Sequence, residues 1–138
     1  MSKTNLDYLQ ITLYEENNIL YSKWTRDVTQ DEYRAGIKQI LRRLQQPHIY
    51  YWISDCGKLT GLTILNQQWL LREIAPALCS IPLKKIAHIG NDDVFSFLVM
   101  DNIVQKTIEL YDFQADFMQF KTYEAAVHWL GFHQSQFA

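Results

Sequence analysis

Short apolar runs typical of β-strands alternate with longer amphipathic stretches typical of helices along most of the 138-residue chain. The clearest run is Ile-Tyr-Tyr-Trp-Ile at 49–53, which is apolar almost throughout, as expected of a strand buried in the middle of a sheet. Strands separated by helices favour right-handed crossovers and largely parallel pairing. This alternation predicts an α/β fold with one layer of sheet and covering helices.

The first two predicted strands form a hairpin. Residues 9–14 alternate apolar with polar side chains, as a half-buried strand does, and 19–24 form the returning strand. Between them, the residues Glu-Glu-Asn-Asn at 15–18 are typical of a turn. A helix follows, because Thr29 and Glu32 have the spacing of a capping box and apolar residues then recur at helical spacing.

After the apolar run at 49–53, the remaining chain adds more helices and two further strands. The second helix begins near Leu65 and is expected to kink or end near Pro76, which has no backbone N–H to donate. The predicted fold class is α/β, with a single mixed, mostly parallel five-stranded sheet, an N-terminal β-hairpin and four helices. It forms one domain over residues 1–138, with a core at about 9–132. The later elements are a strand at 85–89, a helix opened by 91–93, a strand at 117–120 and a helix capped by Thr122.

Composition and charge exclude several classes of protein. Apolar residues make up 48% of the chain and charged residues 20%, so a packed core is expected and disorder is not. The formal net charge is −2 and the basic residues are dispersed, so no nucleic-acid-binding face is predicted. No apolar run approaches the roughly 20 residues of a membrane span. Without an apolar targeting segment near Met1, the expected location is the cytoplasm.

The sequence offers no set of residues for enzyme chemistry. Cys56 and Cys79 lack metal-ligand spacing and are expected to be reduced, partly buried thiols. Asp55 precedes Cys56, and its negative charge should raise the pKa of the neighbouring thiol, which opposes a nucleophilic role. The chain has no Gly-x-Ser-x-Gly elbow, no glycine-rich phosphate loop and no His-x-x-x-His pair. We therefore expect no enzyme activity, no cofactor and no metal.

Polar residues gather where two predicted strands end, at the edge of a parallel sheet that usually binds ligands. Asp55 and Cys56 close one strand, and Asn-Asp-Asp at 91–93 follows the next strand along the chain. Clustered carboxylates can bind a hard cation, but acids are also frequent at loop and helix starts, and we prefer this capping role. The candidate rim for a partner or ligand consists of Asp55, Cys56, Thr63, Trp69, Asn91, Asp92 and Asp93.

Five short segments, read together with the order of the elements, resemble a known family. They are Ile-Leu-Tyr-Ser-Lys-Trp-Thr at 19–25, Val-Thr-Gln-Asp-Glu-Tyr at 28–33, Trp-Ile-Ser-Asp at 52–55, Gln-Gln-Trp at 67–69 and Lys-Lys-Ile-Ala at 84–87. The family is that of the STAS/Sec14-like small bacterial proteins with the SpoIIAA fold. The resemblance spans roughly residues 9–130 and rests on core and turn residues.

This resemblance implies a non-catalytic regulatory or protein-interaction module in the bacterial cytoplasm, with an unidentified protein partner. In STAS antagonists of anti-sigma factors, a Ser or Thr at the start of the second helix is phosphorylated. Thr63 is the nearest hydroxyl here, but the Asp-Ser pair of that motif is missing, so we expect Thr63 to act as a plain N-cap. The Sec14 branch implies the alternative function, a carrier of a small hydrophobic ligand or lipid, with at most a shallow apolar pocket.

The resemblance also implies that all helices cover one face of the sheet. The opposite face would then be available to a partner or to a second copy of the chain, since a homodimer is one expected assembly. Aromatic residues and Met are enriched in the cores of such interfaces. The residues expected on this face are Tyr14, Tyr21, Trp24, Tyr51, Met118 and Phe120.

Overall fold

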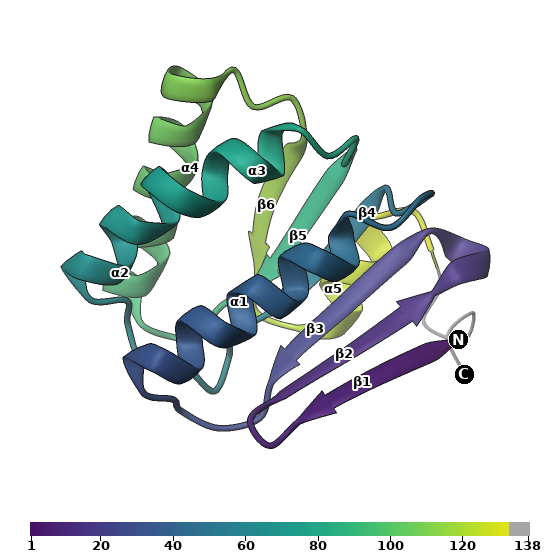
Figure 1. The fold of residues 1–138 in the computed structure, drawn as a ribbon, viewed down its shortest axis with the longest axis horizontal. Coiled ribbons are helices and arrows are strands. Elements are labelled where there is room, and N and C mark those ends of the chain that lie inside the picture. The colour runs from purple at the N-terminus through teal and green to yellow at the C-terminus, as the bar shows by residue number, and fades with distance from the viewer. Residues whose placement is uncertain (133–138) are drawn as a thin grey trace.

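The computed structural model describes residues 1–132, so the last residues of the predicted domain, 133–138, lie outside the described part. Residues 1–132 form one six-stranded mixed sheet whose strands lie in chain order (Figure 1). The first three strands pair antiparallel, and the third to sixth pair parallel. The α/β class and the N-terminal hairpin are as predicted. The strands are β1 (Ser2–Leu6), β2 (Leu9–Tyr14), β3 (Ile19–Trp24), β4 (Tyr51–Asp55), β5 (Lys85–Ile89) and β6 (Asp116–Phe120).

The predicted count of five strands was wrong, because β1 was missed. This strand pairs with β2 from Ser2 opposite Leu13 to Leu6 opposite Leu9, and it forms an edge of the sheet. Its sequence, Ser-Lys-Thr-Asn-Leu, carries no apolar run, and its side chains alternate between half-buried and exposed. Arg43 of helix α1 (Gln30–Leu44) donates a hydrogen bond to the Thr4 hydroxyl across this edge. Edge strands need little apolar surface, so hydropathy alone does not reveal them.

Residues 1–132 contain four helical segments between or after the strands, as predicted. The second one is continuous from 64 to 79 but contains a π-helical turn, in which the Ala75 N–H donates to the Leu70 carbonyl five residues back. Pro76 follows directly, so the wider turn lies just before the residue that cannot donate a hydrogen bond. The helices are α1 (Gln30–Leu44), α2 (Ile64–Trp69), the π-helix η2 (Leu70–Ile74), α3 (Ala75–Cys79), α4 (Val94–Tyr111) and α5 (Tyr123–Trp129), and a 3₁₀ turn η1 (Glu15–Asn17) joins β2 to β3.

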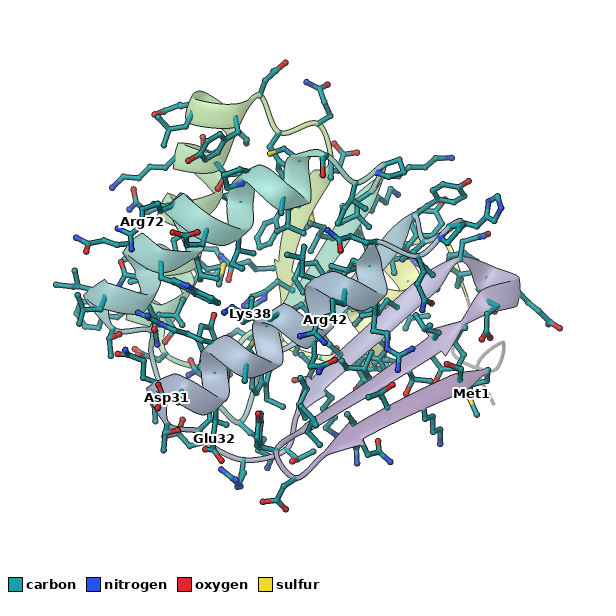
Figure 2. The ribbon with its side chains drawn as sticks, in the orientation of Figure 1. Met1, Asp31, Glu32, Lys38, Arg42 and Arg72 are labelled. Atoms are coloured by element: carbon teal, nitrogen blue, oxygen red, sulfur yellow. The ribbon has the colours of Figure 1, made fainter. Side chains whose placement is uncertain are left out.

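Helix α1 packs on one of the two faces of the sheet. Its start is fixed by the predicted capping box, in which the Thr29 hydroxyl accepts from the Glu32 N–H and the Glu32 carboxylate accepts from the Thr29 N–H. The charged residues Asp31, Lys38 and Arg42 lie on its outer side (Figure 2). The opposite stripe packs on apolar residues of β2 and β3. The buried α1 residues are Tyr33, Gly36, Ile37, Ile40 and Leu44.

Helix α5 covers the other face of the sheet, so the expectation that all helices share one face was wrong. Figure 1 shows α1 in front of the strands and α5 behind them. Ala126 and Val127 of α5 are fully buried against Ile53 and Ala87 of the central strands. A near-continuous apolar strand such as β4 needs cover on both faces, which α5 supplies.

Most of the aromatic face expected to be free is therefore occupied. Tyr21 packs on Tyr123 of α5 with ring centroids 5.0 Å apart, and Phe120 packs on Trp129 at 5.6 Å. Trp24 points to the opposite, α1-covered face, where it is 1% exposed. The wide aromatic docking face implied by the family resemblance is not present in this form.

Candidate functional site

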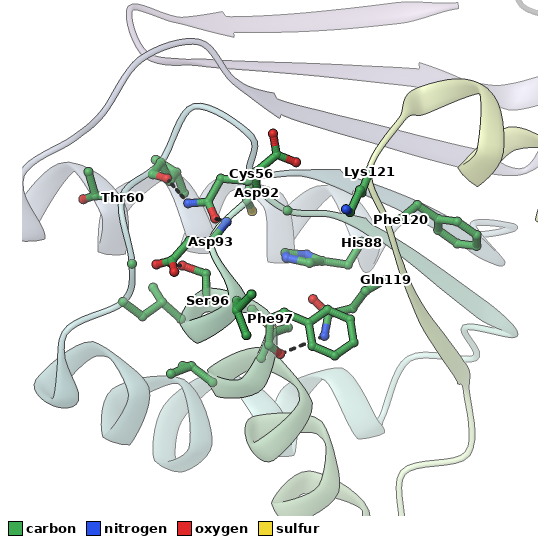
Figure 3. Close-up of a pocket in the computed structure, with 18 of the residues that line it drawn as sticks. Cys56, Thr60, His88, Asp92, Asp93, Ser96, Phe97, Gln119, Phe120 and Lys121 are labelled. Carbon is green, nitrogen blue, oxygen red and sulfur yellow. Dashed lines mark hydrogen bonds between the residues drawn. The ribbon is translucent and has the colours of Figure 1, made fainter.

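A cavity of about 280 Å³ lies at the carboxyl ends of β4, β5 and β6 (Figure 3). The loop after β4, the loop after β5 and the first two turns of α4 form its walls. This is the edge of a parallel sheet where ligands usually bind. Of the seven residues of the predicted rim, four line this cavity and three do not. The four are Cys56, Asn91, Asp92 and Asp93.

Asn91 and Asp93 hold the wall of the cavity in place. The Asn91 amide donates to the Leu59 carbonyl at 2.9 Å, and its oxygen accepts from the Asp93 N–H at 3.0 Å. The Asp93 carboxylate caps α4, since it accepts from the Phe95 N–H at 3.1 Å and from the Ser96 hydroxyl at 3.3 Å. These two residues thus have the capping role that the sequence suggested. Asp92 is exposed at the cavity mouth.

Asp55 and Thr63 lie beside the cavity and not in its wall. Asp55 accepts from the Gly57 N–H at 3.0 Å and from the Tyr21 hydroxyl at 3.5 Å, on the side of the sheet that α5 covers. Burial is the main cause, and the nearby Asp55 a lesser one, of the raised pKa of Tyr21. Thr63 is the N-cap of α2 and accepts from the Asn66 N–H at 3.1 Å.

Trp69 lies in the core, so it does not belong to a contact surface. Its side chain is 6% exposed. It packs edge-on against the ring of Tyr33 at 6.4 Å, and the Arg34 guanidinium lies over its indole at 5.2 Å. Its place in the second helix was predicted, but its side chain points inward and covers α1. We remove it from the candidate rim.

Cys56 is a half-buried residue whose thiol has little nucleophilic character. Burial raises its pKa to about 12, and the Asp55 charge adds to this effect. The Ser54 hydroxyl lies 3.6 Å from its sulfur, within reach of a weak hydrogen bond. A thiol with such a pKa stays protonated at neutral pH, and the thiolate is the reactive form.

Two side chains that sequence reasoning did not select, His88 and Tyr33, form the inner end of the cavity. Each is 6% exposed. Within residues 1–132, no other residue forms a hydrogen bond to the His88 imidazole or the Tyr33 hydroxyl, and their polar atoms are open to the cavity. Figure 3 shows the His88 ring directed into the cavity. Burial lowers the pKa of His88 to about 4, so its ring is neutral at physiological pH.

A second, smaller cavity of about 110 Å³ lies behind these side chains. We call it the inner cavity, and the first one the outer cavity. Helices α1, η2, α3 and α4 and the sheet surround it with apolar side chains. Among the described residues, three side chains line both cavities and so separate them: Tyr33, His88 and Met100.

The first turns of α2 and α4 carry an exposed group of large apolar side chains, which we call the helix-start patch. The two helix starts are neighbours, since a Cβ atom at Gly61, just before α2, would lie 3.5 Å from the Ser96 hydroxyl of α4. Exposed fractions in the patch run from 54% at Leu98 to 77% at Phe95. The patch consists of Ile64, Leu65, Val94, Phe95 and Leu98.

Residues 1–132 contain neither a group of candidate metal ligands nor a helix suited to a membrane span. No three His, Cys, Asp or Glu side chains in this part of the chain gather closely enough to hold a metal ion. None of the helices in the same residues combines the length and the apolar character needed to cross a membrane.

Comparison with known proteins identifies the fold. The chain matches no known family model and no curated protein. It is similar to the crystal structure of an uncharacterised protein of the DUF3478 family from Shewanella loihica PV-4, which has a SpoIIAA-like fold. The TM-score is 0.53 at 19% sequence identity, and the match covers 94% of this chain and 98% of the other. At this identity the likeness concerns the fold alone. The chain has a SpoIIAA-like fold, as its resemblance to the STAS/Sec14-like proteins implied.

Proposed function

We propose that the protein is a non-catalytic, cytoplasmic module that regulates through contact with a protein partner at the helix-start patch. The observation that carries this proposal is the exposure of five large apolar side chains on two neighbouring helix starts. Soluble proteins rarely expose such groups without a use for them, and exposed apolar clusters often mark interaction sites. Two free cysteines, Cys56 and Cys79, support a reducing compartment such as the cytoplasm.

The charges around the patch favour a protein over a membrane as its partner. Segments 60–71 and 91–105 contain three aspartates and no Lys or Arg. An anionic lipid surface attracts basic segments, and the aspartates around the patch would repel it. A partner surface with an apolar centre and a basic rim would complement the patch, because complementary charges speed association and exclude wrong partners.

The state of the polar groups in the outer cavity supports a non-catalytic role. Cys56 keeps its proton at neutral pH because burial raises its pKa to about 12. His88, whose pKa is lowered to about 4, is a weak base, and no carboxylate among residues 1–132 hydrogen-bonds to it. A nucleophile needs an activating base, and a catalytic base needs a pKa near the working pH.

The test uses the opposite end of α4 as its control. The double variant Phe95→Ser, Leu98→Ser changes the patch, while Ile108→Ser, Leu110→Ser changes two exposed apolar residues far along the same helix. Tagged wild-type protein and both variants are used for capture from lysate of the source organism, with bound proteins quantified by mass spectrometry. We expect the patch variant to lose one specific partner roughly tenfold or more, and the control variant to retain it.

Two outcomes would count against the proposal. If the patch variant and the control variant retain every bound protein equally, the patch is not the contact surface. If light scattering shows a concentration-dependent dimer that only the patch variant loses, then the patch joins two copies of this chain. Thermal melting of each variant ensures that a loss of binding is not a loss of folding.

A second candidate function is the binding of a small ligand. The specific observation in its favour is the pair of adjoining cavities, of about 280 and 110 Å³, with buried polar groups between them. Ligand sites are typically concave and mostly apolar, with a few convergent polar groups. This function does not require the helix-start patch, so the two proposals can be tested separately.

A further inference from the structure

We propose that the outer and inner cavities form one binding site for a small, uncharged, amphipathic molecule. Its polar group hydrogen-bonds to His88 and Tyr33, and its apolar part fills the inner cavity. The ligand class is a single aromatic ring or a short branched chain that carries a hydroxyl or an amide. This inference rests on the second function proposed above, ligand binding, and is independent of contact with a protein partner.

The first argument is that two buried polar groups at one place lack protein partners. His88 of β5 and Tyr33 of α1 are each 6% exposed, and neither side chain hydrogen-bonds to another residue in the described part of the chain. Buried polar side chains are nearly always hydrogen-bonded, and no described side-chain nitrogen or oxygen that is shut off from solvent lacks a partner. The polar atoms of His88 and Tyr33 therefore reach the open space of the cavity, where a bound molecule can hydrogen-bond to them. The fully buried Ser22 differs, since its hydroxyl accepts from the Trp52 indole at 2.9 Å.

The second argument is the position of these two groups. Both belong to the set of three side chains that line the outer and the inner cavity. Met100 is the third, and its unbranched side chain adapts readily to a neighbouring group. A molecule that displaces Met100 slightly would therefore pass from the outer cavity into the inner one, with its polar group at the level of His88 and Tyr33.

The charges around the site select a neutral ligand. His88 and Tyr33 are both uncharged at neutral pH, since burial lowers the pKa of the imidazole and raises that of the phenol. Every described residue that lines the inner cavity is uncharged as well. The carboxylates of Asp92 and Asp93 stand at the mouth and oppose an anion, although Lys121 lies across from them. A cation would lose its hydration without gaining a buried carboxylate.

The size of the inner cavity limits the apolar part of the ligand. Its volume is about 110 Å³, and its walls include Ile37, Leu78, Ile103 and Phe117. An apolar cavity of roughly 150 Å³ lined by similar residues binds benzene. One aromatic ring is thus the apolar group that best matches this volume, and a long acyl chain exceeds it. A hydroxyl both donates and accepts, which matches a neutral imidazole and a phenol.

The experiment uses three probes of similar size: phenol, toluene and benzoate. Phenol has the expected polar group, toluene has none, and benzoate is an anion at neutral pH. Binding to the full-length protein is measured by titration of backbone amide NMR shifts. We expect phenol to bind, and toluene and benzoate to bind at least tenfold more weakly.

Two variants test the role of the polar pair. Tyr33→Phe removes only the hydroxyl, and His88→Phe keeps a ring against Phe117, which it stacks on at 5.9 Å in the native protein. Each is expected to weaken phenol binding about tenfold and to leave toluene binding unchanged. Tyr50→Phe is the matched control, because its hydroxyl lies beside His48, away from both cavities. If His88→Phe does not fold, Tyr33→Phe still gives the answer.

The outcomes separate this inference from the function on which it rests. If phenol and toluene bind equally well and neither variant changes this, the cavities bind ligands through apolar contact alone; ligand binding then stands and the inference fails. If benzoate binds best, the charge argument is wrong and the inference fails. If none of the three probes binds, both the inference and the ligand-binding function are overturned.

Discussion

Gly36 allows helix α1 to pack directly on the indole of Trp24. A methyl group at this position would lie 2.8 Å from the indole Cζ3 and 3.2 Å from Leu9 Cδ2. Trp24 is 1% exposed and Leu9 is fully buried, so neither can move aside without disturbing the core. Although Ala forms helices better than Gly, we expect Gly36→Ala to lower the free energy of unfolding by about 1–3 kcal/mol through overpacking. Urea denaturation measures this change.

The exposed neighbour Ala35 provides the control for Gly36. Ala35→Gly makes the reverse change one position away, and it should cost about 1 kcal/mol through helix propensity alone. If Gly36→Ala proves as stable as the native protein or more so, the close packing between α1 and Trp24 is disproved.

Residues that act through near neighbours in the chain were predictable, whereas those that act through distant contacts were not. Asp93 could be identified because a helix start attracts an acid, and Asn91 because it follows a strand. His88 was correctly placed in a strand, but its exposure to the cavity depends on α1 and α4, which are remote in sequence. The one sequence signal for a special role of His88 was that it is the polar residue in the otherwise apolar run Ile86–Ile89. Tyr33 had no signal, because its position on the apolar stripe of α1 predicts ordinary packing.

The N-terminus of α1 depends on a reciprocal pair of hydrogen bonds. The Thr29 hydroxyl accepts from the Glu32 N–H at 3.2 Å, and the Glu32 carboxylate accepts from the Thr29 N–H at 3.0 Å. Thr29→Ala removes the first of these, and the expected loss in the free energy of unfolding is about 1 kcal/mol. Thr29→Ser keeps the hydroxyl and should change stability far less. Equal losses in the two variants, measured by urea denaturation, would show that the cap does not stabilise the helix.

At the level of elements, hydropathy found every strand that has an apolar face and missed the one that does not. Strand β1 is polar because it pairs along one edge only, and its hydrogen bonds to β2 are backbone interactions that any sequence can make. The prediction that one face of the sheet is free of helices was also wrong, because α5 covers that face. The apolar run that enters β4 indicated that both faces of the sheet are covered, since a strand without polar alternation is buried on both faces and needs helices on each. The family resemblance outweighed this local signal.

Across the whole molecule, the two faces of the sheet differ in how much open space lies beside them. The face under α5 is closed by tightly packed aromatic and aliphatic side chains. The face under α1, α2, α3 and α4 contains both cavities, and the helix-start patch lies at its rim. Ligand sites are usually concave and mostly apolar, and both cavities fit this description. Both proposed sites therefore lie on the side of α4.

The buried imidazole of His88 should make the stability of the whole domain depend on pH. Its pKa is about 4 in the folded protein, against an ordinary value of 6.5. Between these values the unfolded chain takes up a proton that the folded protein does not, so the free energy of unfolding falls as the pH is lowered from 6.5 to 4. The full loss is roughly 3 kcal/mol, from about 1.4 kcal/mol for each pKa unit.

Urea denaturation of the native protein and of His88→Phe, at several pH values from 7 to 4, tests this dependence. The variant has no group to protonate at this site, so its stability should fall less steeply over that range. Glu32 interferes little, because the Arg26 guanidinium lowers its pKa to about 2 and its stabilising effect is lost only below its ordinary value of 4.5. If both proteins lose stability in parallel between pH 6.5 and 4.5, then His88 is protonated in the folded state. The inner wall of the cavity would then become positively charged below about pH 6.5, and in that range the preference for a neutral ligand would be replaced by a preference for an anion.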